Sequence, residues 1–135
     1  MNNLSLQLIS PDKEYFVGIV EMVVLPGENG DFSVLPDHAP IITYLRPGKI
    51  SIIVERGKEL SYFVASGFVK VDNNNCHVLV DYIKSESDLN ESDLKKELAS
   101  IFEKIENEKD QEVIKRLMER KIILEEEINF SEHIS

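Results

Sequence analysis

Apolar and polar residues alternate over the first part of the chain with the period of a β-strand that has one buried face. Leu4, Leu6 and Leu8 alternate with Ser5 and Gln7, and successive side chains of a strand point to opposite faces. Further short apolar or β-branched runs occupy 15–17, 21–25, 50–54, 61–65, 68–71 and 77–83, with turn-forming residues at 26–30, 46–48, 56–58 and 73–75. Many short strands with no helix between them predict an antiparallel β-sandwich over residues 1–85.

The second part of the chain has the period of amphipathic helices. Its apolar residues recur at three- and four-residue steps, first at Leu94, Leu98, Ile101, Phe102 and Ile105, then at Val113, Leu117, Leu124 and Ile128. A short polar stretch, 106–110, separates the two runs, and Asn90 or Ser92 can cap the first helix. The pattern predicts an antiparallel α-helical hairpin over residues 86–135, so the expected fold class is α+β.

Composition supports this division and excludes some functions. All six glycines and all five prolines lie at or before Gly67, as expected when breakers punctuate strands and then stop. The 135 residues carry 15 Lys+Arg against 25 Asp+Glu, a formal charge of −10. This charge argues against nucleic-acid binding, which needs a basic face. We expect no membrane span and no export signal, and Cys76, the single cysteine, allows no internal disulfide.

Residues that could carry catalysis or bind a metal are sparse. Cys76 and His77 are adjacent in a predicted strand, so their side chains point to opposite faces and suit neither a metal site nor a thiolate pair. The Gly27-x-x-Gly30 spacing lacks the strand–loop–helix context and the lysine of a phosphate-binding loop. We therefore expect no catalytic residue, no metal and no cofactor. A small enzyme with a site in the sandwich would need a deep polar pocket with perturbed acids, of which the sequence has no sign.

Two features suggest binding surfaces. The segment from Pro26 to Pro40 holds three prolines, two glycines and His38, which predicts either plain turns or a preorganised binding loop. The second is a basic cluster in an acidic chain, formed by Lys115, Arg116, Arg120 and Lys121. We expect its members on roughly one side of the second helix. There they either pair with neighbouring glutamates or form a docking face for an acidic partner.

The first part of the chain also resembles a known family. The segments VEMVVLPGENGDFSVLPDHAP, LRPG, FVASGFVKV and VLVD follow one another in this order. They are similar in order and spacing to the epsilon subunit of F-type proton-translocating ATP synthases, of the bacterial type. The helical pair at about 90–129 matches that family's C-terminal hairpin in position and length. The resemblance implies the same fold, a β-sandwich followed by two helices.

The resemblance implies a non-catalytic rotor subunit in the central stalk. Its sandwich would bind the gamma subunit and rest on the ring of c subunits through a loop from Glu28 to His38, with Glu28, Asp31, Asp37 and His38 as the contacts. Its hairpin would fold against the sandwich or extend into the catalytic head of alpha and beta subunits and oppose ATP hydrolysis. Lys115, Arg116, Arg120 and Lys121 would then meet acidic segments of beta. The location implied is peripheral, at the cytoplasmic face of the bacterial inner membrane; a plastid origin is the alternative.

Two departures from the family pattern affect these expectations. Asp37 stands where family members often have Gly before the loop histidine, and Asp tolerates the left-handed region better than most residues. Some bacterial members bind ATP through an acid-x-x-Arg-Ala stretch early in the first helix, where this chain has Asp93 and Leu94. Asp93 would repel phosphate, so we expect no ATP binding. The alternative function is a free-standing β-sandwich protein-interaction module, which would not co-purify with gamma and c subunits.

Overall fold

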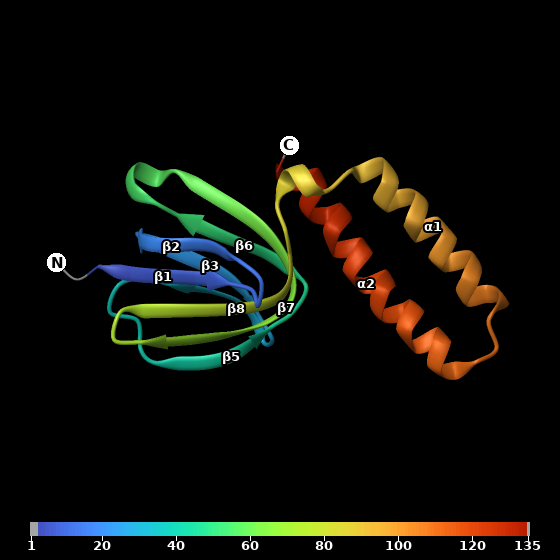
Figure 1. The fold of residues 1–135 in the computed structure, drawn as a ribbon, viewed down its shortest axis with the longest axis horizontal. Coiled ribbons are helices and arrows are strands. Elements are labelled where there is room, and N and C mark those ends of the chain that lie inside the picture. Colours follow the sequence, from blue (N-terminus) through green and yellow to red (C-terminus); the bar gives the residue numbers. More distant parts are fainter. Residues whose placement is uncertain (1–2, 135) are drawn as a thin grey trace. The chain divides into compact units, whose positions relative to one another are not determined.

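The computed structural model describes residues 3–134, and the chain divides into two compact units, Met1–Ser85 and Glu86–Ser135. The first unit contains strands β1 (Leu4–Ile9), β2 (Glu14–Val20), β3 (Met22–Gly27), β4 (Gly30–Val34), β5 (Ile41–Leu45), β6 (Gly48–Ile53), β7 (Glu59–Asp72) and β8 (Asn75–Lys84). The second contains α1 (Glu91–Asn107) and α2 (Gln111–Ile134). Short 3₁₀ turns lie at Glu55–Gly57 and Glu86–Asp88. The predicted fold class, a β-sandwich followed by two helices, is confirmed (Figure 1).

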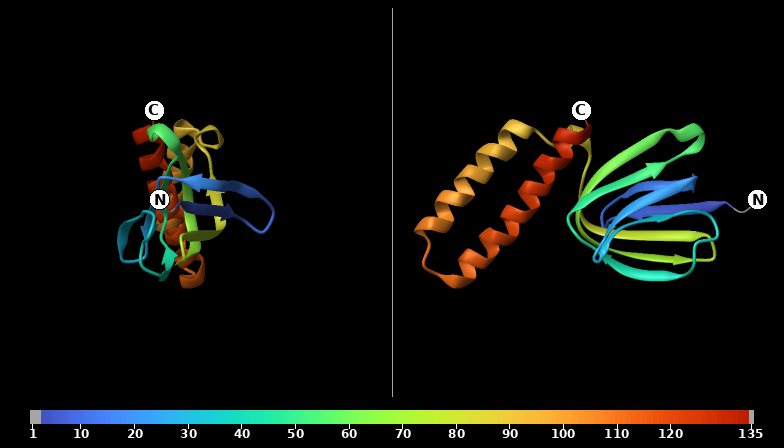
Figure 2. Two further views of the ribbon diagram at one scale, coloured as in Figure 1. Left: turned by 90° about the vertical axis from the view of Figure 1, so that its left-hand side faces the viewer. Right: turned by 180° about the vertical axis from the view of Figure 1, so that it is seen from behind.

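The strands form one continuous hydrogen-bonded path in the order β2-β1-β8-β7-β5-β3-β4, with β6 paired to β3 and β7. The path curves around a shared interior (Figures 1 and 2). Its pairs are antiparallel except one: β1 and β8 run parallel, from Ser5 opposite Asn75 to Ile9 opposite Leu79. The sequence predicted a wholly antiparallel sandwich, and the parallel pair of β1 and β8 is the one exception to that prediction. Strands far apart in the sequence can pair in either direction because no tight turn joins them.

Strands β5 and β6 lie between β7 and β3 and together make one partner of β7 that is interrupted once. Both pair with β7 in the same register, from Ile41 opposite Val71 to Ile53 opposite Glu59. The break falls at Arg46 and Pro47, and proline cannot donate to the ladder. On its other side, β7 pairs with β8 with register shifts between Val64 and Gly67, where the strand bends (Figure 1).

The core consists of the inward side chains of the alternating strands. β1 shows the predicted alternation, with Leu4, Leu6 and Leu8 at most 1% exposed. Burying each such side chain fully contributes about 1.5–3 kcal/mol. The other fully buried members include Val23, Leu25, Val34, Ile50, Ile52, Val64, Val69, Val71, Cys76, Val78 and Val80. Every strand contributes to this core, β2 through Val20 and β5 through Leu45.

Turn residues adopt the conformations that their side chains allow. Asn73 and Asn74 join β7 to β8 with φ of 50° and 62°, as the asparagine tract predicts. Asp37 has φ of 69°, so it takes the left-handed conformation expected of it. The prediction of a five-residue turn at 26–30 is wrong, because Pro26 and Gly27 end β3 and pair with Asp31 and Gly30. The connection between the two strands is only Glu28 and Asn29.

The helices pack along a narrow apolar seam. Leu94, Ile101 and Leu124 are buried, and Leu89, Leu98, Ile105, Leu117 and Ile128 pack around them. Asn90 is the N-cap of α1, and its side chain accepts the N–H of Asp93 at 3.1 Å. Phe102 was expected on the buried face but remains 49% exposed, since each residue turns a helix by about 100° and Phe102 follows the buried Ile101. Neither described helix is long and apolar enough to cross a membrane.

Candidate interaction surfaces

The tip of the β3–β4 hairpin is a stiff, acidic projection. Glu28 donates its N–H to the carbonyl of Tyr44 at 2.9 Å, and Arg46 donates its N–H to that of Pro26 at 3.0 Å. Asp31 Oδ1 accepts from Arg46 Nη2 at 2.6 Å. The Asp31 side chain nevertheless stays 66% exposed. Three tethers to the β5–β6 junction thus hold the tip while its carboxylates face solvent.

Asp37 and His38 lie at the opposite end of β4. The N–H of Asp37 donates to Asn74 Oδ1, and Asn74 Nδ2 donates to Asp37 Oδ1 at 3.2 Å. The His38 N–H donates to the carbonyl of Leu35 at 3.1 Å and closes the turn. The polar groups of Asp37 are therefore engaged with the β7–β8 turn.

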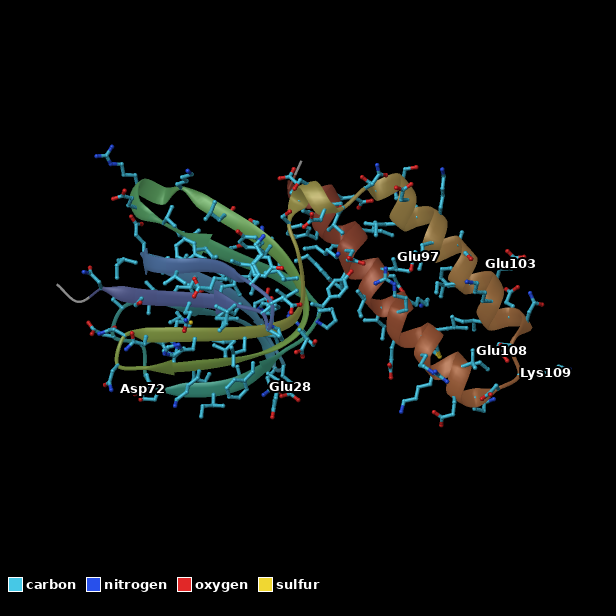
Figure 3. All side chains as sticks on the ribbon, viewed as in Figure 1. Glu28, Asp72, Glu97, Glu103, Glu108 and Lys109 are labelled. Carbon is cyan, nitrogen blue, oxygen red and sulfur yellow. The ribbon has the colours of Figure 1, made fainter. Side chains whose placement is uncertain are left out.

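The structure does not bring the four sequence-predicted ring residues together. The expectation of a single loop from Glu28 to His38 is wrong, because residues 30–34 form β4 between them. Figure 3 shows Glu28 at one end of the sandwich and Asp72, next to the turn that binds Asp37, at the other. Two separate acidic ends replace the predicted loop.

A further surface, which sequence reasoning missed, is the outer face of strands β2, β1, β8, β7 and β5. Four residues in register form an apolar row across β5, β7, β8 and β1, namely Tyr44, Phe68, Leu79 and Ile9, and the row ends on β2 at Glu14. Tyr44 is 63% exposed and Leu79 49%. The Tyr44 and Phe68 rings meet edge to face with centroids 5.7 Å apart.

Two neighbouring rows extend this face with few charges. The next row runs Ile42, Lys70, His77, Gln7, Val17, and the one after it Asp72, Asn75, Ser5, Ile19. Val17 and Ile19 are each 58% exposed. With Glu14, three residues of the three rows carry a full charge, the others being Lys70 and Asp72, and Asp81 is exposed two residues after Leu79 on β8. Exposed apolar residues that adjoin one another in this way mark an interaction surface.

The predicted basic cluster does not occupy one face of α2. Arg120 Nε and Nη2 donate to Oε2 and Oε1 of Glu97 on α1, at 2.8 and 3.2 Å. Lys121 lies over the ring of Phe102, 5.2 Å from its centroid, and pairs with Glu125 at 2.9 Å. Adjacent residues of a helix point about 100° apart, so Arg120 and Lys121 take different sides.

Intramolecular contacts also distinguish the members of the cluster. Arg116 reaches the carbonyl of Glu112 at 3.4 Å, and Lys115 is exposed on the surface of α2. Arg120 holds the pKa of Glu97 below its ordinary value through their hydrogen bonds, against an opposing effect of burial. Pairing with glutamates, one of the two readings of the cluster, therefore applies to Arg120 and Lys121.

Cys76 and His77 take opposite faces of β8, as the sequence predicts. Cys76 is fully buried, and burial raises the pKa of its thiol to about 12. His77 points outward, with Nδ1 3.0 Å from Gln7 Oε1. Among residues 3–134, no group of three or more His, Cys, Asp or Glu side chains could hold a metal ion.

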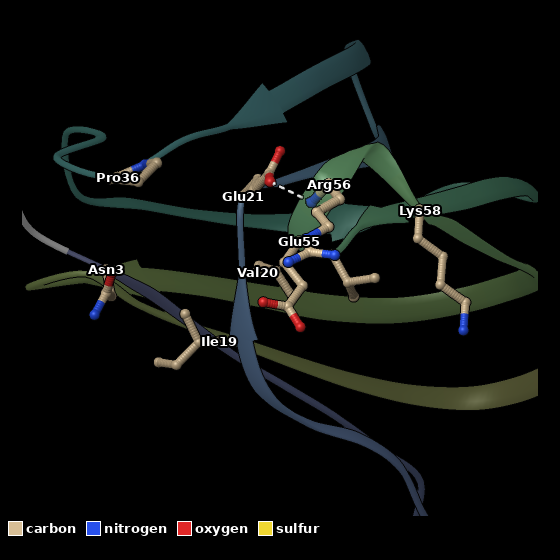
Figure 4. Close-up of a pocket in the computed structure, with 9 residues that line it drawn as sticks. Asn3, Ile19, Val20, Glu21, Pro36, Glu55, Arg56 and Lys58 are labelled. Atoms are coloured by element: carbon tan, nitrogen blue, oxygen red, sulfur yellow. Dashed lines mark hydrogen bonds between the residues drawn. The ribbon is translucent and has the colours of Figure 1, made fainter.

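A surface groove of about 1110 Å³ lies beside the β2–β3 corner and the β6–β7 connection (Figure 4). Its charged lining residues are Glu21, Glu55, Arg56 and Lys58, two of each sign. Glu21 Oε1 already accepts the N–H of Arg56 at 2.9 Å. The balanced charges give the groove no net attraction for a charged ligand.

Comparison with known proteins places this geometry in a family. Residues 3–86 match the family model for the β-sandwich domain of the ATP synthase delta/epsilon chain. The chain belongs to this family. A relative named ATP synthase epsilon chain, from Maricaulis maris (strain MCS10), is 37% identical over 111 residues, which cover 82% of this chain and 83% of the relative.

Two solved structures share the fold of the family member described here. One is from the Euglena gracilis mitochondrial ATP synthase, OSCP/F1/c-ring in rotational state 1, with a TM-score of 0.87 at 20% identity, covering 98% of this chain and 83% of that one. The other is from the central stalk/c-ring of the Tetrahymena thermophila mitochondrial ATP synthase, with a TM-score of 0.64 at 17% identity, covering 95% and 96%.

Sequence signals existed for part of what was missed. Consecutive apolar residues, as in Ile41-Ile42 and Val78-Leu79-Val80, point to the two faces of a strand in turn. They indicate that such a strand is apolar on its outer face as well as on its inner face. No signal linked Asp31 to Arg46 or Glu97 to Arg120, since each pair forms only when distant segments meet.

Proposed function

We propose that this chain is a non-catalytic central-stalk subunit of an F-type ATP synthase, which couples proton flow through the c ring to ATP synthesis through the gamma subunit. Family membership and the epsilon-chain relative support this assignment. The neighbouring structures come from assemblies named for the c-ring and the central stalk. We place the subunit peripherally at the cytoplasmic face of a bacterial inner membrane, in keeping with its resemblance to bacterial epsilon subunits.

The observation that carries the proposal is the apolar row on the outer face of β5, β7, β8 and β1. A rotor subunit must hold its shaft through a full turn, which favours a broad apolar contact over a few exposed ion pairs. The row of Tyr44, Phe68, Leu79 and Ile9 supplies aromatic and aliphatic anchors across four strands. We propose that this face binds the gamma subunit.

A matched pair of variants tests the gamma contact. Leu79 and Phe102 are each 49% exposed, and Leu79 lies on the apolar row while Phe102 lies on α1. L79D should weaken gamma binding by at least about tenfold, because a carboxylate would be buried without a partner, whereas F102D should bind normally. Equal binding by both variants, with unchanged thermal unfolding, would show that the face does not bind gamma.

We propose that the c ring meets the end that carries Glu28 and Asp31. These carboxylates project from a tethered hairpin tip, whereas Asp37 is engaged with Asn74 and lies, with His38, at the other end. A cysteine introduced as D31C should cross-link to a c subunit in the assembled enzyme, and D37C should not. Cross-linking from D37C alone would place Asp37 and His38 at the ring instead.

We further propose that the helical hairpin opposes ATP hydrolysis by contacting the catalytic beta and alpha subunits. The basic residues of α2, Lys115, Arg116, Arg120 and Lys121, are the contacts proposed. Ending the chain after Ser87 should leave assembly intact and raise ATP hydrolysis. Unchanged hydrolysis would refute the inhibitory role and leave the coupling role standing. We propose no ATP binding to this chain, and calorimetry that detected tight binding would contradict that.

A further inference from the structure

The seam between α1 and α2 combines a small set of fully buried apolar side chains with a larger set that is only partly buried. Three side chains are buried in it, Leu94, Ile101 and Leu124, while the hairpin is rich in charged residues on its remaining surface. Ion pairs that cross from one helix to the other therefore contribute to whether the helices stay together.

Arg120 and Glu97 form the best-aligned of these crossing pairs. Two guanidinium nitrogens donate to two carboxylate oxygens at 2.8 and 3.2 Å across 23 sequence positions, the bidentate geometry that makes arginine pairs strong. Lys95 and Glu132 also bridge the helices, with a single contact of 3.5 Å. The Glu91–Lys95 and Lys121–Glu125 pairs are four residues apart on one helix and cannot join the two.

Arg120 keeps a second carboxylate on its own helix. Its Nη1 lies 3.5 Å from Oε1 of Glu127, which is 1% exposed. If the helices separate, Glu97 leaves with α1 while Glu127 stays on α2. The Nε and Nη2 atoms of Arg120, which had donated to Glu97, would then face the surroundings of α2. The Arg120 side chain is 33% exposed even in the closed hairpin, so another carboxylate can approach it.

We propose that the ion pair between Arg120 and Glu97, here called the clasp, holds α1 against α2. We propose also that a protein partner binds α2 by placing an acidic side chain against Arg120 in the position of Glu97. The partner half of this inference rests on the proposed function. Arg120 differs in this from two other members of the basic cluster, since Arg116 donates to the backbone of its own helix and Lys115 is exposed. The closed and the engaged states of the hairpin then compete for one guanidinium group.

The clasp is tested in the full chain by native-state amide hydrogen exchange. E97Q should make the amides of Leu94 and Ile101 exchange about two- to fivefold faster, the size expected for a partly exposed ion pair. R120Q, on the other helix, should have the same effect on these α1 amides, and the double variant should add little more. Raising the salt concentration should shrink the difference from wild type.

Matched controls separate the clasp from a general loss of charge. Glu103 lies on α1 with its side chain exposed (Figure 3), so E103Q should leave exchange unchanged. R116Q is the corresponding control on α2. If E97Q and R120Q exchanged no faster than E103Q and R116Q, the clasp would be overturned.

The partner half is tested in the assembled synthase by the rate of ATP hydrolysis. E97Q should lower the rate because it frees Arg120 for the partner, and R120Q should raise it, each compared with E103Q and with K109Q, a change of an exposed lysine outside the basic cluster. If ending the chain after Ser87 raises hydrolysis but R120Q matches K109Q, the exchange of carboxylates is overturned. If that truncation changes nothing, the proposed inhibition fails, and the amide exchange still decides the clasp.

Discussion

Gly67 lies where β7 bends, and the structure predicts that no side chain fits there. A Cβ at this position would lie 2.5 Å from the carbonyl oxygen of Leu79, 3.1 Å from Val80 Cγ1 and 3.2 Å from Leu45 Cδ1. Carbon–oxygen contacts between strands normally measure about 3.3–3.6 Å, so G67A would have to push β7 and β8 apart by almost 1 Å. The atom in the way belongs to a backbone held in the ladder, which cannot rotate aside.

The loss in the free energy of unfolding caused by G67A should therefore lie at the upper end of the range found for overpacked cores. Inserting a methyl group into a packed core costs about 1–3 kcal/mol, and we expect about 3 kcal/mol at Gly67. In a unit of this size such a loss lowers the melting temperature by roughly 12–24 °C. Gly18 offers a matched control on β2. A Cβ there would lie 3.6 Å from the Phe16 ring, an ordinary contact, so G18A should stay within about 0.5 kcal/mol of wild type.

Tyrosine fluorescence during urea and thermal unfolding provides the assay. The four tyrosines, Tyr15, Tyr44, Tyr62 and Tyr82, all lie within the first unit, and the chain has no tryptophan. The signal therefore reports the sandwich and not the helices. If G67A and G18A lost the same stability, the close approach of β8 to Gly67 would not be a constraint, and the reasoning from the bend in β7 would be wrong.

Three further predictions concern single groups. At pH 8 the thiol of Cys76, whose pKa burial raises to about 12, should not react with a thiol reagent until urea unfolds the sandwich; labelling of the folded chain within minutes would contradict its burial. N90A should lower the stability of α1 by about 1 kcal/mol, measured by circular dichroism of the helices on heating. S92A should lower it less, because Asn90 is the N-cap. Equal losses in the two variants would show that Asn90 is not the cap. Arg120 lowers the pKa of Glu97, so the pair stabilises the hairpin above the ordinary carboxyl value of 4.5 and loses that effect as the pH falls through the lower folded value. The protection of α1 amides, corrected for the intrinsic exchange rate at each pH, should thus fall with acid more in wild type than in E97Q, and parallel pH profiles would count against the pair.

Local pattern was sufficient where one segment's own chemistry decides its conformation. The alternation of Leu4, Leu6 and Leu8 identified a strand and its buried face, because the side-chain period of a strand is two. The left-handed conformations of Asp37 and Asn73 followed from residue types that tolerate them. Neither the two-residue connection at Glu28 and Asn29 nor the strand character of Pro26 followed, since Pro and Gly indicate turns unless a partner strand pairs with them.

The sequence by itself determined the two units and most of the elements within them. Only the tertiary structure decided which residues act together. The parallel pairing of β1 with β8 and the common register of β5 and β6 placed Ile9, Leu79, Phe68 and Tyr44 in one row, although they lie up to 70 positions apart in the chain. In the helices, too, the tertiary structure decided which residues act together, because among the four basic residues of the cluster it paired Arg120 with Glu97 of α1. Strand register and helix partner depend on long-range packing, which no local pattern of residues encodes.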